Sequence, residues 1–126
     1  MPEDKWDEPL EEGRFTPREI VAHLADWEPI LLERMRITRD TPGGRLQGID
    51  ETQRAEEQGY SRDAGEQGEL FLARRKETIA WLRTVRPEDW AKHAEHTERG
   101  RMALADQANA LLGHDIYHIE QLSAYL

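Results

Sequence analysis

Residues 113–121 read Gly113-His114-Asp115-Ile116-Tyr117-His118-Ile119-Glu120-Gln121. In a helix, the rise of about 1.5 Å per residue places His114 and His118 one turn apart on the same face, about 6 Å from each other. That face continues as a mostly apolar row formed by Leu104, Gln107, Ala108, Leu111, Gln121, Leu122 and Tyr125. The sequence therefore predicts a helix over about residues 103–125 with two imidazoles in its core-facing row.

Two histidines four residues apart on a helix can present two nitrogens to one divalent metal ion. The alternative is a pair of core histidines whose ring nitrogens are satisfied by hydrogen bonds. A third ligand on another helix would favour the metal site, and His23 is the candidate.

His23 falls in a second predicted helix. Thr16 is placed as its N-cap, Pro17 as its first residue and Glu19 as the other half of a capping box. Pro29 lies inside this helix and removes the hydrogen bond to the Ala25 carbonyl. The apolar residues recur at three-to-four spacing and are Ile20, Leu24, Trp27, Leu31 and Met35. The sequence 41–44, Thr-Pro-Gly-Gly, ends the helix.

Between these two helices the chain is more polar. Residues 41–67 form a long crossover with a short exposed helix predicted over 50–58. A further helix is predicted over about 67–85, with Leu72, Ile79 and Leu82 in its apolar row. Arg75 falls in the same row, either at its edge with the guanidinium in solvent or aimed into a polar cavity beside the metal. Residues 86–90 read as a capped turn, and 93–101 as a polar loop that exposes His93 and His96.

The composition limits the classes of partner that the protein can bind. The 126 residues suit a single domain over 1–126. Their net charge of −9 argues against nucleic acid or an anionic membrane surface as a partner. No apolar run approaches the roughly 20 residues of a membrane span, and residues 1–4 lack signal-peptide features. The chain has no cysteine, so chemistry depends on other side chains or a bound ion. We expect a cytoplasmic protein.

If the first and last helices are neighbours, His23, His114 and His118 converge on one ion. Three neutral imidazoles suit Zn²⁺, Ni²⁺ or Fe²⁺ and leave coordination positions for water or a substrate. That layout is typical of a catalytic metal site rather than a closed structural one.

Two segments together resemble the DinB/YfiT-like superfamily. Residues 15–28, Phe-Thr-Pro-Arg-Glu-Ile-Val-Ala-His-Leu-Ala-Asp-Trp-Glu, resemble its second-helix signature, and residues 113–121 resemble its C-terminal H-D-x-x-H-x-x-Q run. The resemblance implies an all-α, up-down-down-up bundle with a histidine triad that binds a divalent metal. It also implies a thiol-dependent S-transferase, a hydrolase or an isomerase, since these are the activities of characterised relatives.

The family pattern has a further helix ahead of the segment that resembles residues 2–15. We therefore expect a shortened bundle of three main helices plus short helical segments. Three amphipathic helices leave one apolar groove uncovered, because residues 1–12 offer only Trp6 and Leu10 as large apolar anchors. A homodimer that closes this groove through the first and last helices is the expected assembly.

The functional prediction is a divalent-metal-dependent enzyme that acts on a small molecule, with a low-molecular-weight thiol as a possible co-substrate for S-transfer and hydrolysis as the other reaction. Asp26 and Asp115 are the carboxylates expected to orient the imidazoles, and Arg75 and Tyr125 are weaker candidates for substrate contact. The alternative is a non-catalytic module, serving as a metal-stabilised dimer or a ligand-binding protein.

Overall fold

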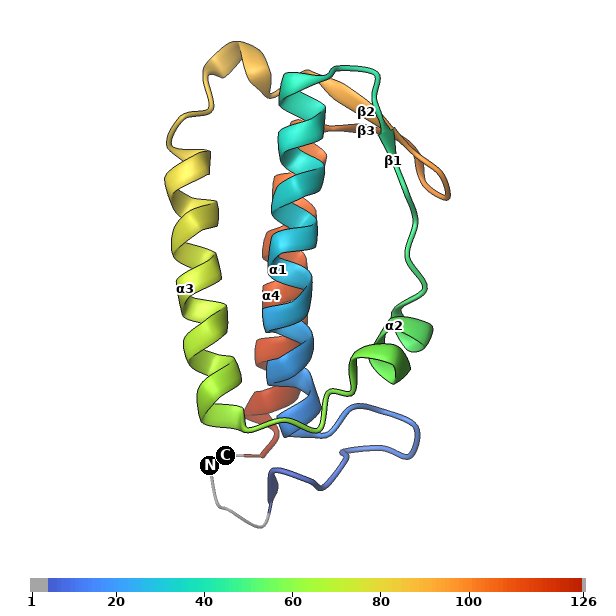
Figure 1. Ribbon diagram of the computed structural model, residues 1–126, viewed down its shortest axis with the longest axis vertical. Coiled ribbons are helices and arrows are strands. Elements are labelled where there is room, and N and C mark those ends of the chain that lie inside the picture. Colours follow the sequence, from blue (N-terminus) through green and yellow to red (C-terminus); the bar gives the residue numbers. More distant parts are fainter. Residues whose placement is uncertain (1–4, 126) are drawn as a thin grey trace.

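The computed structural model describes residues 5–125 and contains three long helices, a short helix and a small sheet at one end (Figure 1). The long helices are α1 (Pro17–Asp40), α3 (Ala64–Leu82) and α4 (Leu104–Ser123). In Figure 1, α1 and α3 run in the same direction and α4 runs back against them. This is the course of the last three helices of the predicted up-down-down-up bundle, so the predicted fold class is confirmed.

Helix α1 begins as predicted. Glu19 N donates to Thr16 Oγ1 at 3.2 Å and Thr16 N donates to Glu19 Oε1 at 3.0 Å, which closes the capping box. Pro29 lies inside the helix and leaves the Ala25 carbonyl without its usual donor. Arg74 of α3 supplies one, through Nη1 at 2.5 Å. The missing α1 hydrogen bond thus becomes a contact between two helices.

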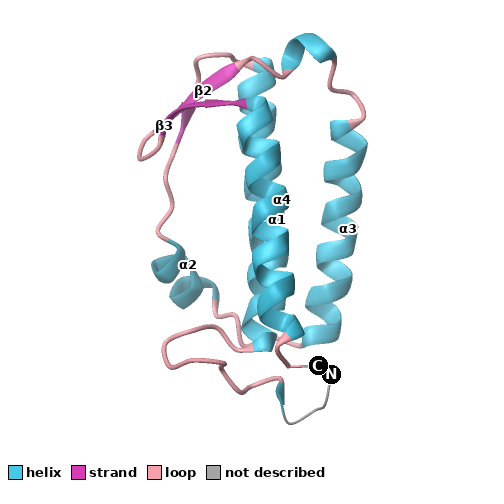
Figure 2. Ribbon diagram, turned by 180° about the vertical axis from the view of Figure 1, so that it is seen from behind, coloured by secondary structure: helices cyan, strands magenta, loops and turns pink. Residues whose placement is uncertain are grey.

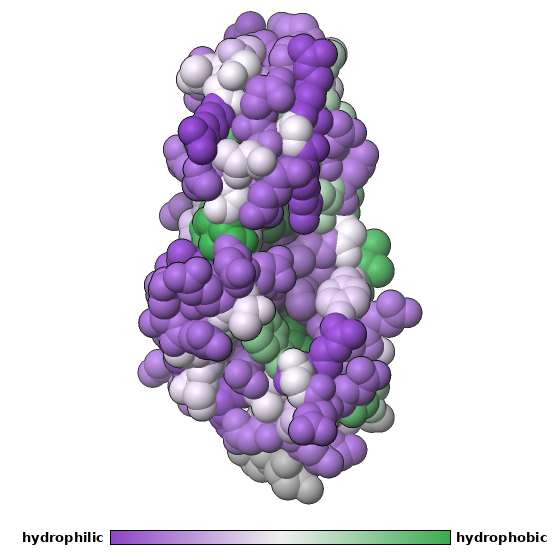
Figure 3. Space-filling model, turned by 90° about the vertical axis from the view of Figure 1, so that its right-hand side faces the viewer, coloured by the Kyte–Doolittle hydropathy of each residue, from purple (hydrophilic) through white to green (hydrophobic). Residues whose placement is uncertain are grey.

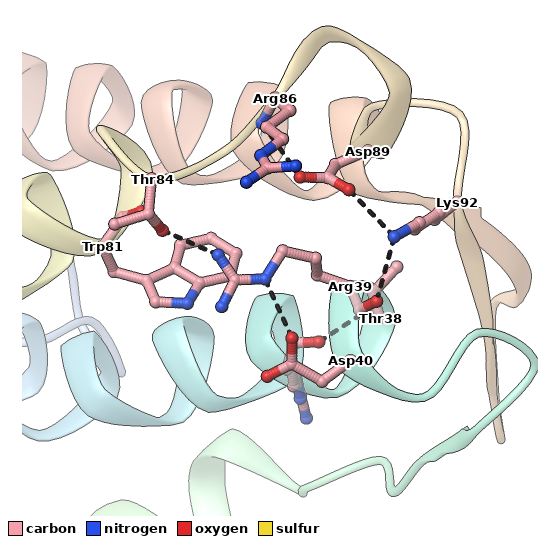
Figure 4. Close-up of polar contacts among 9 residues, drawn as sticks. Thr38, Arg39, Asp40, Trp81, Thr84, Arg86, Asp89 and Lys92 are labelled. Atoms are coloured by element: carbon pink, nitrogen blue, oxygen red, sulfur yellow. Dashed lines mark hydrogen bonds and ion pairs between the residues drawn. The ribbon is translucent and has the colours of Figure 1, made fainter.

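The apolar core lies between the three helices towards the sheet end. Its buried members are Leu32, Met35, Trp81, Leu104 and Leu111. Polar contacts close this end of the bundle (Figure 4). The Arg39 guanidinium lies 4.5 Å from the Trp81 ring centre and donates to Thr84 Oγ1 at 2.7 Å. In the short helix η2 (Pro87–Asp89), the Asp89 carboxylate accepts hydrogen bonds from Arg86 N and Lys92 Nζ, both at 2.9 Å.

The predicted polar loop at 93–101 is wrong, because these residues form a hairpin. Strand β2 (His93–His96) pairs antiparallel with β3 (Gly100–Ala103) and parallel with β1 (Arg45–Leu46). Ala94 and His96 alternate into the protein, and His96 is buried rather than exposed. One small apolar residue on the inward face is too weak a signal for a strand prediction. Gly100, with φ +77°, takes the left-handed conformation at the hairpin turn.

The crossover passes down the opposite side of α1 from α3 (Figures 1 and 2). Its helix α2 (Glu51–Gln58) is confirmed, with the Asp50 side chain accepting from Gln53 N at 2.9 Å. Helix α3 starts three residues before the predicted Gln67, because Asp63 caps it. Residues 1–4 of the predicted N-terminal turn lie outside the described residues. Within that turn Leu10 is 56% exposed and is not the anchor that was predicted.

A buried charged triad joins the three long helices. The Arg75 guanidinium of α3 donates to both Glu28 carboxylate oxygens of α1, at 2.7 and 2.8 Å. It also donates to both Asp115 oxygens of α4, at 2.8 and 2.9 Å. Glu28 is 2% exposed. Four of the five guanidinium N–H groups thus bond to Glu28 and Asp115, so the structure gives no support to the prediction that Arg75 contacts substrate.

Exposed apolar side chains flank this triad on α3 and α4. Leu72 and Ile79, predicted as core residues, are 61% and 41% exposed and lie one turn on either side of Arg75. On α4, Leu112, Ile116 and Ile119 are 58–64% exposed, and Leu112 and Ile119 lie one turn on either side of Asp115. Because Arg75 and Asp115 bond to each other, these side chains lie on neighbouring parts of the two helices, here called the α3/α4 apolar face.

The triad should make a large contribution to stability. Within residues 5–125, Arg75 is the only side chain that pairs with the Glu28 carboxylate, so replacing Arg75 with leucine leaves a buried charge, which costs about 3–5 kcal/mol. Urea unfolding monitored by circular dichroism measures the loss. The adjacent exposed residue gives the control, since Lys76→Leu should change the unfolding free energy by less than about 0.5 kcal/mol. Equal effects of the two substitutions would contradict the structural role of the triad.

Candidate metal centre

Three imidazoles from two helices meet near the end of the bundle that holds the described termini. His23 Nε2 of α1 lies 3.0 Å from His114 Nε2 of α4, and His118 Nε2 lies 3.1 Å from the same atom. Each histidine offers one nitrogen, and the three nitrogens lie within 4.8 Å of one another. The structure thus brings together the three histidines that the sequence selected.

Gln121 fixes the orientation of one ring. Its Oε1 lies 2.7 Å from His118 Nδ1, and because an amide oxygen only accepts, Nδ1 carries the proton. His118 Nε2 then presents a lone pair to the cluster. Gln121 stood in the predicted helical row, one turn after His118, but its role was missed.

Hydrogen bonds among three neutral rings cannot satisfy all three Nε2 atoms. His114 Nε2 makes two short contacts, and a neutral ring has at most one hydrogen there to share between them. If His114 Nε2 is bare, it faces the lone pair of His118. If it carries a hydrogen, it cannot also accept one from His23. A cation at the point of convergence satisfies all three nitrogens, so the donor set fits a metal ion.

The electrostatics favour uncharged imidazoles. Burial, followed by the neighbouring His118 and His114, lowers the pKa of His23 from 6.5 to about 3. Burial and His118 lower the pKa of His114 to about 4. Burial also lowers the pKa of His118. The rings are therefore neutral near pH 7, which is the form that binds metals.

Aromatic residues hold His23 in place. Its ring centre lies 5.3 Å from Phe15, 5.9 Å from Tyr60 and 6.0 Å from Trp27. Tyr60 donates through its hydroxyl to Asp26 at 2.6 Å. Asp26 also accepts from Arg54 of α2, at 2.6 and 2.7 Å. These contacts attach the crossover to α1 directly behind the cluster.

Within residues 5–125, neither predicted carboxylate makes a hydrogen bond with an imidazole. Asp26 pairs with Arg54 and Tyr60, and Asp115 pairs with Arg75. Both carboxylates were chosen because they stand near histidines in sequence. Asp26 lies one helical turn from His23 and Asp115 directly follows His114, but each meets an arginine. Their contribution to the site is to position the helices that carry the histidines.

The cluster faces an open cavity of about 380 Å³. Beyond the histidines, its walls come from the N-terminal segment, α2 and α4, and include Arg14, Phe15, Glu51, Thr52, Tyr117 and Gln121. Arg14 Nη1 donates to the Tyr117 hydroxyl at 3.0 Å. Sequence reasoning missed Arg14 and Glu51, because they lie far from either motif. Tyr117 stood inside the motif, on a neighbouring side of the helix.

Tyr125, predicted as a substrate contact, lies beside this site rather than in it. It is 6% exposed and lines a separate cavity of about 170 Å³ together with Leu10, Phe15 and Gln121. Phe15 and Gln121 line both cavities. The two spaces are therefore neighbours.

A helical bundle with three neutral imidazoles turned onto one point defines a candidate metal-binding protein. The chain belongs to the DinB superfamily, whose sequence pattern matches residues 1–122. It is also similar to a solved structure, that of YfiT from Bacillus subtilis, described as a probable metal-dependent hydrolase with an unusual four-helix bundle topology. That match has a TM-score of 0.90 at 21% sequence identity and covers 98% of this chain and 72% of YfiT. The likeness establishes the fold.

No curated protein matches the chain in sequence. Among residues 5–125, no helix is both long and apolar enough to cross a bilayer.

The lowered pKa values predict acid sensitivity of the metal-free protein. Unfolded histidines take up protons as the pH falls below about 6.5, whereas the buried rings stay neutral until about pH 3–4. The unfolding free energy should therefore decrease between pH 6.5 and pH 4, by up to about 1.4 kcal/mol per pH unit for each such histidine. Urea unfolding of EDTA-treated protein at pH 7.5, 6.5 and 5.5 measures the slope.

A control variant distinguishes the contribution of the histidine cluster to the pH dependence from that of other titrating groups. His114→Asn should make the slope shallower, while His93→Asn on β2 should leave it unchanged. A slope that is the same in both variants would mean that the cluster does not set the pH dependence.

Proposed function

We propose that the chain binds one divalent metal ion through His23, His114 and His118 and uses it for hydrolysis of a small-molecule substrate. The observation that carries this proposal is the convergence of the three Nε2 atoms, at 3.0 and 3.1 Å, in an open cavity. Metal–nitrogen bonds of about 2.0–2.1 Å require cis nitrogens roughly 3 Å apart, so little movement is needed. The description of YfiT as a probable metal-dependent hydrolase supports this choice.

The ligand set suggests which ions fit. Three imidazoles are borderline donors that suit Zn²⁺, Ni²⁺ or Fe²⁺, and they add no negative charge. When bound, such an ion supplies Lewis-acid chemistry and lowers the pKa of a coordinated water or thiol towards neutrality.

The chain's own residues prepare the site for that chemistry. Gln121 holds the proton of His118 on Nδ1, so that Nε2 is available as a donor atom. Arg14 and Tyr117 bond to each other on one wall of the cavity and offer a cation and a hydroxyl to an incoming substrate. Glu51 brings a carboxylate from α2 to the same cavity, where it can accept a proton.

A second candidate function is S-transfer with a low-molecular-weight thiol as co-substrate. The Arg14 guanidinium favours it, because it provides a charge partner for the carboxylates that such thiols carry. Paired assays separate the two reactions. Turnover of esters or amides without thiol supports hydrolysis, whereas consumption of thiol together with an electrophile supports transfer. Activity that survives both EDTA and His118→Ala would count against the metal centre in either reaction.

The metal assignment predicts one ion per chain. His118→Ala removes one of three ligands and should reduce metal retention to less than about one tenth of the parent value. His93→Ala, outside the cluster, should retain the parent amount. Elemental analysis of protein purified without a His tag, followed by isothermal titration of Zn²⁺, gives both stoichiometry and affinity. Equal losses in the two variants would exclude this ligand set.

We also propose that two copies of the chain pack together over the α3/α4 apolar face. Its five apolar side chains are 41–64% exposed, and soluble monomers rarely leave a large apolar surface open. A two-fold axis places the same leucine and isoleucine side chains against each other. The predicted use of α1 in the interface is not supported, because the large apolar side chains exposed among residues 5–125 belong to α3, α4 and the N-terminal segment.

A homodimer is therefore the expected state at micromolar concentration. Ile116→Glu places a charge on the α3/α4 apolar face, which should shift the protein to a monomer in sedimentation equilibrium. Leu10→Glu is the matched control, since Leu10 is 56% exposed but lies on the N-terminal segment. A parent protein that is already a stable monomer would rule out this assembly.

A further inference from the structure

A second cavity lies further along α1 and α4 from the metal centre, under the hairpin. It has a volume of about 40 Å³ and opens between α1, β1, the hairpin and α4. Polar groups from Arg34, His96, Arg99 and Gln107 line it, and Leu31 and Leu46 form part of its apolar wall. We call it the hairpin cavity. One water fills roughly 10–15 Å³ on such a measure, so the space suits a group of a few heavy atoms.

Gln107 lines this cavity and carries an unpaired acceptor. Its side chain is 8% exposed, and its Nε2 lies 2.6 Å from Thr38 Oγ1. The Thr38 hydroxyl donates its single hydrogen to the Arg34 carbonyl at 2.9 Å, so it must accept from the Gln107 amide. This fixes the amide orientation and leaves Oε1, which is buried and has no hydrogen-bond partner among the described residues. A buried acceptor of this kind requires a donor.

His96 contributes a donor. Its Nδ1 accepts from Glu98 N and Arg99 N, both at 3.1 Å, so Nδ1 is bare and Nε2 carries the hydrogen. Burial, followed by Arg34 and Arg99, lowers the pKa of His96 and keeps the ring neutral. The ring is therefore held as a single tautomer at the edge of the cavity.

Two guanidinium groups give the cavity a positive potential. Arg34 donates to the Gln47 carbonyl at 3.0 Å and lies 5.6 Å from the Trp27 ring centre, so neutral groups hold it. Within residues 5–125, neither Arg34 nor Arg99 has a carboxylate at ion-pair distance, and Glu98 in the same turn pairs with neither. Burial and the charge of Arg99 lower the pKa of Arg34. An anion would relieve this uncompensated charge.

We propose that the hairpin cavity binds a small 2-hydroxycarboxylate group. The carboxylate pairs with Arg34 and Arg99, the adjacent hydroxyl donates to Gln107 Oε1, and the aliphatic carbons contact Leu31 and Leu46. A 2-amino acid fits less well, because its ammonium group would lie beside two guanidinium ions. A carboxylate without the hydroxyl leaves Gln107 Oε1 unpaired.

The position of the cavity connects it with the metal centre. Ala110 lines it one helical turn before His114, and the Trp27 ring lies between His23, at 6.0 Å, and Arg34, at 5.6 Å. Both cavities face the crossover side of the molecule, where Figure 3 shows a mostly hydrophilic surface hollowed at mid-height. The hairpin cavity and the metal centre are therefore neighbours along α1 and α4, but the proposed binding does not depend on a metal ion.

The test uses metal-free protein, because 2-hydroxycarboxylates also chelate metal ions. Ligand-observed NMR titration compares glycolate with acetate, which differ by the hydroxyl. Glycolate should bind at least tenfold more tightly than acetate. Gln107→Leu should abolish this difference, and Arg99→Met, a change at an exposed side chain that leaves the core intact, should weaken both ligands. Arg45→Met, on an exposed position of β1, is the charge-matched control and should leave both affinities unchanged.

Each outcome decides the assignment. Equal affinity for glycolate and acetate, or a preference that persists in Gln107→Leu, overturns it. Glycolate binding that requires added Zn²⁺ and is lost in His118→Ala assigns the ligand to the metal centre and also overturns it. If metal binding fails but the metal-free protein still selects glycolate, the proposed function is wrong and the hairpin cavity stands.

Discussion

The fold depends on one partly buried guanidinium. Arg75 joins Glu28 of α1 to Asp115 of α4, and Glu28 is almost completely removed from water. Desolvated charges tolerate little displacement, since each lost contact leaves an uncompensated charge. Asp115 directly follows His114 in the chain. The rotation of α4 that brings Asp115 to Arg75 therefore also determines where His114 points, so the same contact that assembles the helices aligns the imidazoles.

Helix α1 is the element that fold and site share. It supplies Glu28 to the triad, His23 to the metal centre and Arg34 to the hairpin cavity, within three turns of one another. Trp27 packs against both His23 and Arg34. A rigid helix is a precise support for such groups, because backbone geometry fixes their spacing. The crossover completes the site through Arg54, Tyr60 and Glu51, and its Tyr60 is itself buried.

Much of the fold and of the candidate site could be predicted from the sequence, and the predictions that were wrong share a cause. The capping box at Thr16 and the spacing of His114 and His118 are local patterns, so they placed two helices and three histidines correctly. Periodicity shows which residues share a face but not what packs on that face. Leu72 and Ile79 were therefore read as core although they are exposed. Arg75 pairs with Glu28, 47 positions earlier in the chain, and the strand that carries His96 pairs with the distant strand β1. No local pattern could identify these partners.

The chain separation of the histidines has a consequence for folding. His23 and His114 are 91 residues apart, so their meeting closes most of the chain into one loop. The entropy lost in closing a loop grows only with the logarithm of its length, but it must be lost before the distant contact forms. An ion held by these side chains acts as a reversible cross-link between the first and last helices. It can form only after α4 has docked, and once formed it slows the separation of the two ends of the chain.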